Sequence, residues 1–103
     1  MKQHRYRVTV EHLALPDGTP PAAPQALAFE TGNHDDLLAI VARMRQRGDL
    51  PEADATAFAV GLKLFSEVML QHRGMPLFAG FAPHFRAFMQ QLKQGPAPRE
   101  NTP

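Results

Sequence analysis

The stretch "AVGLKLFSEVML", Ala59–Leu70, decides how the rest of the chain must be arranged. Along one face of a helix over this segment every third or fourth residue is apolar, namely Phe58, Leu62, Phe65 and Met69. Further round the helix lie three more apolar side chains, Val60, Leu64 and Val68. A helix that is apolar nearly all round is typical of a buried element. We therefore predict a central, mostly buried helix.

The other elements must cover this helix, and a chain of 103 residues offers few of them. In one interpretation, a monomer wraps two more helices and a ribbon around it. In the other, a symmetric homodimer buries the remaining apolar side, with Val60, Leu64 and Val68 as the interface candidates. A lone two-stranded ribbon also has two unpaired edges, and pairing across a two-fold axis would give four strands. We favour the homodimer.

The N-terminal third of the chain predicts that ribbon. Residues 4–13, "HRYRVTVEHL", alternate between apolar and polar side chains, as in a half-buried strand. Residues 14–25 hold four prolines and the turn pair Asp17-Gly18, so they predict an exposed loop. The segment "ALAFET" alternates again and predicts a second, antiparallel strand.

The helix boundaries follow from capping residues. Asn33 is the expected N-cap of a first helix, with acidic residues after it, and Gly48 suits the left-handed position beyond its end. Asp49 is the expected cap of the second helix, which should end near His72 or Arg73. The segment "MPLFAGFAPHFRAFMQQLK" contains Pro76 and Pro83, each of which suits the start of a helix. They predict a single turn followed by a longer helix.

The predicted fold is therefore α+β: a two-stranded antiparallel ribbon followed by three helices, in the order β-β-α-α-α. We expect a single domain over residues 1–94 and a disordered tail over residues 95–103.

The composition excludes several classes of protein. A net charge of +1 gives no overall field that would attract nucleic acid or an anionic membrane. The absence of cysteine excludes disulfides and thiolate sites. No signal-peptide pattern and no apolar run of membrane-spanning length is present, so we expect a cytoplasmic, soluble protein without membrane contact.

Four motifs together resemble a known family: "HRYRVTVE", "NHDDL", "VGLKLFSEVML" with "HR" two residues on, and "PLF". They are similar to a bacterial family of small proteins classed as a domain of unknown function, over about residues 4–93. The resemblance implies a compact α+β domain and assigns no activity, cofactor or catalytic residue.

The polar residues indicate no enzyme. The five histidines lack the helical spacings that metal ligands use, and capping explains the acidic residues beside His34. Ser66 is the only serine and lies inside the predicted second helix, without a nucleophile elbow. We therefore expect no catalytic residues, no metal and no cofactor.

Two basic groups are candidate nucleic-acid contacts: Lys2, Arg5 and Arg7 on the first strand, and Arg43, Arg45 and Arg47 at the end of the first helix. Protection of a strand edge explains the first group and interaction with the helix dipole explains the second, so we do not expect nucleic acid as a partner. The phenylalanines at 78, 81, 85 and 88 have the spacing of core residues, and a small-molecule pocket beneath residues 74–83 is the less favoured interpretation.

These observations predict a non-enzymatic bacterial accessory protein that acts by protein–protein contact as a homodimer. The alternative is a regulator that binds a small ligand or nucleic acid.

Overall fold

The structure is a computed structural model that describes residues 2–23 and 25–95. The chain falls into two compact units, Met1–Asp35 and Asp36–Pro103, each of which is taken by itself below. The α+β class is confirmed, with two strands followed by four helices in the described residues. The single domain expected over residues 1–94 stays a prediction. Most of the predicted tail, from residue 96 on, lies outside the described residues.

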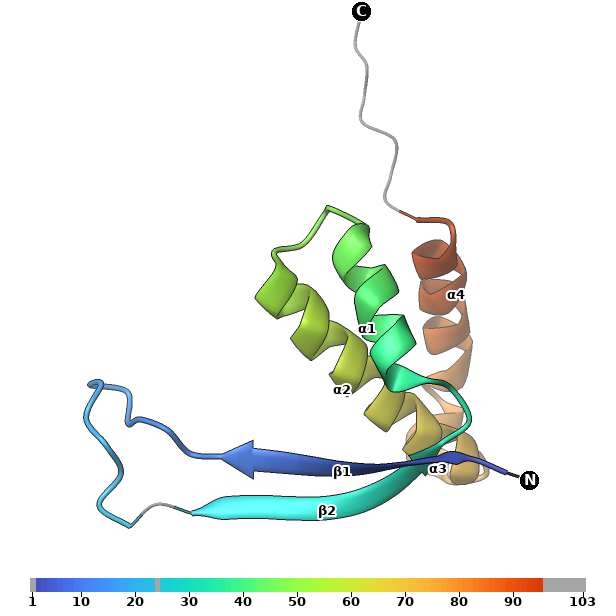
Figure 1. Ribbon diagram of the computed structural model, residues 1–103. Helices are drawn as coiled ribbons and strands as arrows, with labels where there is room; N and C mark the ends of the chain where they lie inside the picture. The colour runs from blue at the N-terminus through green and yellow to red at the C-terminus, as the bar shows by residue number, and fades with distance from the viewer. Residues whose placement is uncertain (1, 24, 96–103) are drawn as a thin grey trace, which may run out of the picture. The chain divides into compact units, whose positions relative to one another are not determined.

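The first unit is the predicted antiparallel ribbon (Figure 1). Strand β1 (His4–Glu11) pairs with β2 (Ala26–Asn33) in one unbroken register, in which Val8 lies opposite Phe29. Because side chains alternate between the two faces of a strand, one face is apolar and the other polar. The apolar face carries Tyr6, Val8, Val10, Leu27 and Phe29.

The predicted turn in the proline-rich loop is present at Asp17-Gly18. The Asp17 carboxylate accepts hydrogen bonds from the Thr19 backbone N–H at 3.0 Å and the Thr19 hydroxyl at 2.6 Å. These bonds lower the pKa of Asp17 below its ordinary value. Gly18 has a φ of 90°, a left-handed conformation that glycine adopts without a steric cost.

The first helix starts three residues later than predicted. Strand β2 continues through Asn33, whose side-chain oxygen accepts the Asp35 N–H at 2.9 Å in a local turn. The N-cap of α1 (Leu37–Gln46) is instead Asp36, which accepts the Ala39 N–H at 3.2 Å. Gly48, with a φ of 83°, occupies the left-handed position beyond the helix, as predicted.

The assignment of the caps is testable by substitution. Asp36→Ala is expected to lower the free energy of unfolding by about 1 kcal/mol, because it leaves a helix N–H without its acceptor. Asp49→Ala, at the position that the sequence favoured as a cap, is expected to cost less, because the lost carboxylate is partly exposed and Arg47 keeps the Leu92 carbonyl oxygen as an acceptor. Urea denaturation followed by circular dichroism measures both. A larger loss for Asp49→Ala would contradict this assignment.

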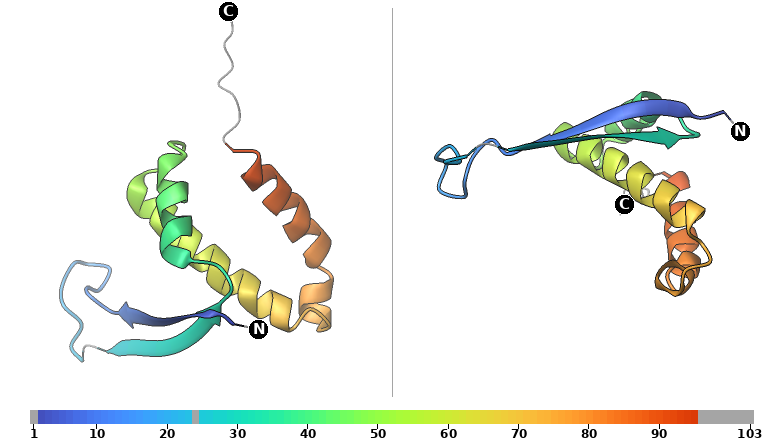
Figure 2. Two further views of the ribbon diagram at one scale, coloured as in Figure 1. Left: turned by 45° about the vertical axis from the view of Figure 1, so that its right-hand side comes forward. Right: turned by 90° about the horizontal axis from the view of Figure 1, so that it is seen from below.

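The core of the second unit lies where α1 packs beside α2 (Glu52–Gln71), and the two helices can be followed in Figure 1 and in the left view of Figure 2. Ala55 and Ala59 of α2 are fully buried, and Met44 of α1 packs with them. Alanines at the contact let the two helix backbones approach closely. Larger, partly buried side chains surround this contact: Ile40, Val41, Phe58 and Leu92.

The predicted burial of α2 is not confirmed. The helix is one continuous rod, as expected, but only Ala55, Ala59, Glu67 and Met69 are buried along its 20 residues. Glu67, which the sequence placed on a polar strip, is 5% exposed and accepts a hydrogen bond from Gln71 at 3.3 Å. Periodicity identifies apolar side chains, but burial depends on how many neighbouring elements the chain supplies.

Four helices are present in the described part of the chain instead of the predicted three, because the expected single turn is a separate element. Helix α3 (Pro76–Ala79) is that turn, and α4 (Ala82–Lys93) is the longer helix that follows. Each of these helices has a proline at its first or second position. Helix α3 turns the chain at the end of α2, so that α4 runs back (Figure 2). The second helix lacks a side-chain cap, since its N-cap is Pro51.

Candidate functional site

Exposed apolar side chains are the most prominent surface feature of the described residues. The buried hydrophobic residues are few: Leu37, Met44, Ala55, Ala59 and Met69. Large apolar side chains that remain exposed are more numerous: Val10, Leu13, Leu15, Leu27, Phe29, Leu38, Leu50, Phe65, Val68, Leu70, Met75, Leu77, Phe81 and Phe88. Single exposed hydrophobic residues are normal, whereas contiguous ones mark interaction surfaces. The question is therefore which of them lie together.

The largest group is an aromatic cluster formed by α2, α3 and α4. Phe65 of α2 is at its centre, with ring centroids 6.3 Å from Phe78, 6.0 Å from Phe81 and 5.9 Å from Phe85, all edge to face. Phe88 continues the cluster along α4, at 6.4 Å from Phe85. These distances and angles are those of favourable aromatic pairs.

This aromatic cluster is packed on one side only. Phe65 is 41% exposed, and Phe81 and Phe88 are each 44% exposed. The sequence predicted the phenylalanines at 78, 81, 85 and 88 as core residues, and their mutual packing fits that prediction only in part. Two neighbouring residues enlarge the apolar surface, Met75 and Leu77, and Leu77 is 71% exposed. The cluster therefore combines a packed interior with an aromatic outer face.

The interface residues predicted from the sequence all lie on α2, and one of them, Val68, is a neighbour of Phe65. Val68 is 47% exposed, whereas Val60 and Leu64 are half-buried. Val68 is three residues from Phe65 and four from Leu64, so it neighbours both of them on the helix surface. Sequence reasoning missed Phe65, because its spacing from Leu62 and Met69 assigned it to the core. No sequence signal separates an outer member of an apolar stripe from an inner one.

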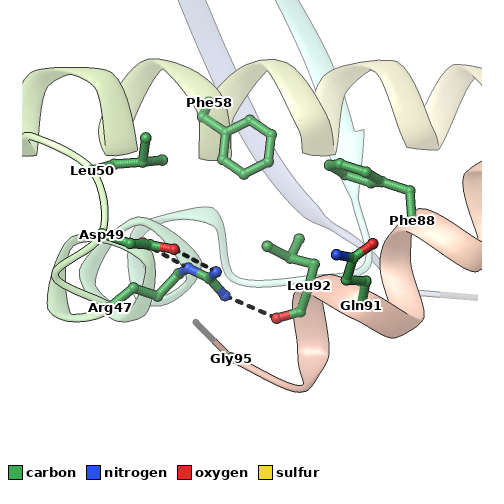
Figure 3. Close-up of a pocket in the computed structure, with 8 residues that line it drawn as sticks. All are labelled: Arg47, Asp49, Leu50, Phe58, Phe88, Gln91, Leu92 and Gly95. Atoms are coloured by element: carbon green, nitrogen blue, oxygen red, sulfur yellow. Dashed lines mark hydrogen bonds and ion pairs between the residues drawn. The ribbon is translucent and has the colours of Figure 1, made fainter. Parts of the chain in front are cut away.

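A hollow of about 350 Å³ opens between the α1–α2 connection and α4 (Figure 3). Its apolar part is lined by Leu50, Phe58, Phe88 and Leu92. It does not coincide with residues 74–83, where the sequence placed a possible pocket. The sequence missed this hollow, because its lining comes from three separate segments.

The polar side of this hollow is an ion pair. The Arg47 guanidinium donates to Asp49 at 3.1 and 2.8 Å, and also to the Leu92 carbonyl oxygen at 2.9 Å (Figure 3). The hydrogen bond from Arg47 holds the pKa of Asp49 below its ordinary value. Asp49 thus pairs with Arg47 instead of capping α2. An arginine and an aspartate on either side of a left-handed glycine were the sequence signal for this pair.

The predicted basic patch is partly neutralised within the ribbon. Arg5 and Arg7 both pair with Glu30 of β2, at 3.3 and 2.8 Å. These contacts, that of Arg7 first, lower the pKa of Glu30. Lys2 lies in the same unit and is exposed. The three residues therefore do not present three unpaired cations, which weakens the case for a phosphate-binding surface.

Among the described residues, no group of three or more histidine or acidic side chains is placed to hold a metal ion. His34 lies 3.9 Å from Asp35, and this pair is largely exposed. Over the same part of the chain, no helix has the length and apolar character needed to cross a membrane.

Comparison with known proteins places this fold in a family. A solved structure from Pectobacterium atrosepticum, described as a protein of unknown function, is 40% identical and superimposes with a TM-score of 0.78. The match covers 90% of this chain and 99% of that one. No curated protein matches. The model of a family described as a domain of unknown function with a solved structure, DUF3861, matches residues 4–94, so the chain belongs to that family.

Proposed function

We propose that this protein acts by protein–protein contact as a homodimer, as a non-enzymatic accessory protein of the bacterial cytoplasm. The observation that carries the proposal is the excess of exposed over buried large apolar side chains in the described residues. Monomeric proteins rarely leave contiguous apolar surface of this kind in water. A second copy of the chain is the partner that is always available to cover it.

The size of the core supports this proposal. The contact between α1 and α2 centres on two alanines, which bury little area, and on Met44. Fully burying one large apolar side chain is worth roughly 1.5–3 kcal/mol. The exposed faces of Phe65, Phe81 and Phe88 therefore represent stabilisation that a single copy does not use. Association of two copies would recover part of it.

We place the contact on the side of α2 that carries Val60, Leu64 and Val68. Val68 and Leu70 are almost equally exposed, at 47% and 48%, but lie on nearly opposite sides of the helix because they are two residues apart. Val68 can therefore lie in a contact along this side of α2 while Leu70 stays outside that contact. They are thus a matched pair for testing the proposal.

Val68→Asp is expected to dissociate the homodimer, because it would bury an unpaired carboxylate at the contact. Leu70→Asp, with the same charge and the same initial exposure, should leave the dimer intact. Light scattering on a size-exclusion column gives the masses, and circular dichroism checks that both variants fold. Equal behaviour of the two variants would remove α2 from the interface.

The hollow beside Arg47 is the observation that favours the alternative, a small-ligand-binding regulator. Its volume is at the low end of ligand pockets, and its lining combines apolar side chains with Arg47, Asp49 and Gln91. However, the Arg47 guanidinium already binds Asp49 and Leu92, so a ligand anion would have to displace an existing partner. This makes ligand binding the weaker of the two proposals.

A further inference from the structure

We infer that the second copy binds at the free edge of β2, so that residues 26–32 pair antiparallel with their own copy across a two-fold axis at Phe29. The two ribbons would then form one four-stranded sheet with the order β1-β2-β2-β1. This inference rests on the proposed homodimer and gives it a second contact, along a strand edge of the first unit, besides the contact proposed on α2. A two-stranded ribbon is only marginally stable alone, whereas a sheet of four strands with an apolar face can be stable by itself.

The hydrogen bonds of the ribbon determine which backbone groups are free. The His12 N–H donates to the Gln25 carbonyl at 3.2 Å, and this pair continues the register of Val8 with Phe29. In an antiparallel ladder, hydrogen-bonded pairs alternate with pairs whose N–H and C=O groups point outward. On β2 the outward groups therefore belong to the even-numbered residues: Ala26, Ala28, Glu30 and Gly32.

The side chains at the two edges distinguish β2 from β1. The outward residues of β1 include Arg5, Arg7 and Glu11, and charged side chains at an edge oppose the pairing of strands. Along β2 the corresponding residues are two alanines, a glycine and Glu30. Glu30 is already neutralised by Arg5 and Arg7 of its own ribbon. The edge of β2 thus lacks the protection that β1 carries.

The alternation of faces selects the register, and charge adds a weak preference because the charges concerned lie about 14 Å apart. With the axis at Phe29, Glu30 lies opposite the partner's Ala28, and Ala26 lies opposite the partner's Gly32. The row across the sheet through Ala26 then ends in Glu11 on one side and the partner's Arg5 on the other, which are opposite charges. An axis at Ala28 would instead bring Glu30 into one row with the partner's Glu11. A shift by one residue would place apolar side chains on the polar face.

The apolar face of the ribbon fits this arrangement as well. Its exposed members are Val10, Leu27 and Phe29, at 58%, 61% and 41%. Across the axis, Phe29 would face the partner's Phe29 in a pair without hydrogen bonds, the closer of the two pair types. Aromatic pairs directly across two strands stabilise a sheet. The register would therefore extend one apolar face over both copies.

Proline substitutions test the edge directly. In Ala28→Pro the lost N–H points away from β1, so the ribbon keeps its own hydrogen bonds while the new pairing loses one. Thr9→Pro is the matched control, because Thr9 is the register partner of Ala28 and points outward from the other edge. We expect Ala28→Pro to raise the dissociation constant of the homodimer at least tenfold and Thr9→Pro to change it less than twofold, by light scattering over a dilution series.

Cross-linking tests the axis, and the natural chain has no cysteine to interfere. Facing residues without hydrogen bonds lie about 4.5 Å apart at Cα, within the range that a disulfide spans. Phe29→Cys is expected to form a covalent dimer on oxidation, and Val8→Cys, its register partner on β1, is expected to stay uncross-linked.

The outcomes separate this inference from the proposed function. A covalent dimer of Val8→Cys, or dissociation by Thr9→Pro alone, would assign the contact to β1 and overturn the inference. The inference would also be overturned if neither proline substitution changed the dissociation constant of the homodimer and Phe29→Cys gave no cross-link. The proposed homodimer would stand in that case. A wild-type protein that is monomeric throughout the dilution series would refute the proposed function itself.

Discussion

Ala59→Asp is expected to unfold the protein. Ala59 is fully buried against α1, so the new carboxylate would lie without water or a cation in the small core around Met44. A buried unpaired charge is among the most destabilising changes known, and the expected loss of more than about 4 kcal/mol is a large part of the roughly 5–15 kcal/mol that stabilises a typical domain. Circular dichroism should show loss of helix at room temperature.

The control for this prediction is Ala53→Asp. Ala53 lies in the exposed first turn of the same helix, where the helix dipole favours negative charge. Its unfolding free energy should stay within about 0.5 kcal/mol of the wild-type value. If Ala59→Asp instead kept the wild-type midpoint of denaturation, the assignment of the contact between α1 and α2 as the core would be wrong.

Phe85→Ala is expected to lower the free energy of unfolding by about 2–3 kcal/mol. The Phe85 ring contacts Phe65, Phe81 and Phe88, so its removal breaks three aromatic pairs and opens a gap in the cluster. Truncating a fully buried phenylalanine costs roughly 3–5 kcal/mol, and the half-buried position of Phe85 reduces that figure.

Leu77→Ala is the matched comparison for the aromatic cluster. Leu77 belongs to α3 and is 71% exposed, so its truncation should change the unfolding free energy by less than about 0.5 kcal/mol. Urea denaturation curves of the two variants test the difference. Similar losses for both would show that the cluster does not hold α4 against α2.

The ribbon and the order of the elements were predictable because they depend on local pattern. Alternation over residues 4–13 gave the first strand, although it ends at Glu11 in the structure. The spacing of Pro76 and Pro83 gave a single turn before a longer helix. In both cases the side chains that define the element lie within it, so no distant partner was needed.

The caps were harder to predict, because several residues of suitable type lie close together. "NHDD" holds three residues that can cap a helix, and the extension of β2 through Asn33 leaves Asp36 as the cap. Asp49 is also a good cap by type, but the left-handed Gly48 turns it toward Arg47. The choice depends on where the neighbouring element stops, which local pattern does not specify.

The burial of α2 could not be predicted from its own residues. An apolar helix is buried only if other elements cover it, and within the second unit α2 packs against α1 and, through aromatic rings, against α3 and α4. Phe65 and Val68 therefore remain about half exposed, although their periodicity suited a core. The hollow beside Arg47 was unpredictable for a similar reason, since its lining residues are far apart in sequence.

The most direct test of the proposed function is the mass of the wild-type protein in solution, by multi-angle light scattering on a size-exclusion column. The chain has a mass of 11.4 kDa, and the proposed homodimer predicts twice that value at micromolar concentration. A mass of 11.4 kDa at every concentration up to the millimolar range would contradict self-association through these apolar surfaces.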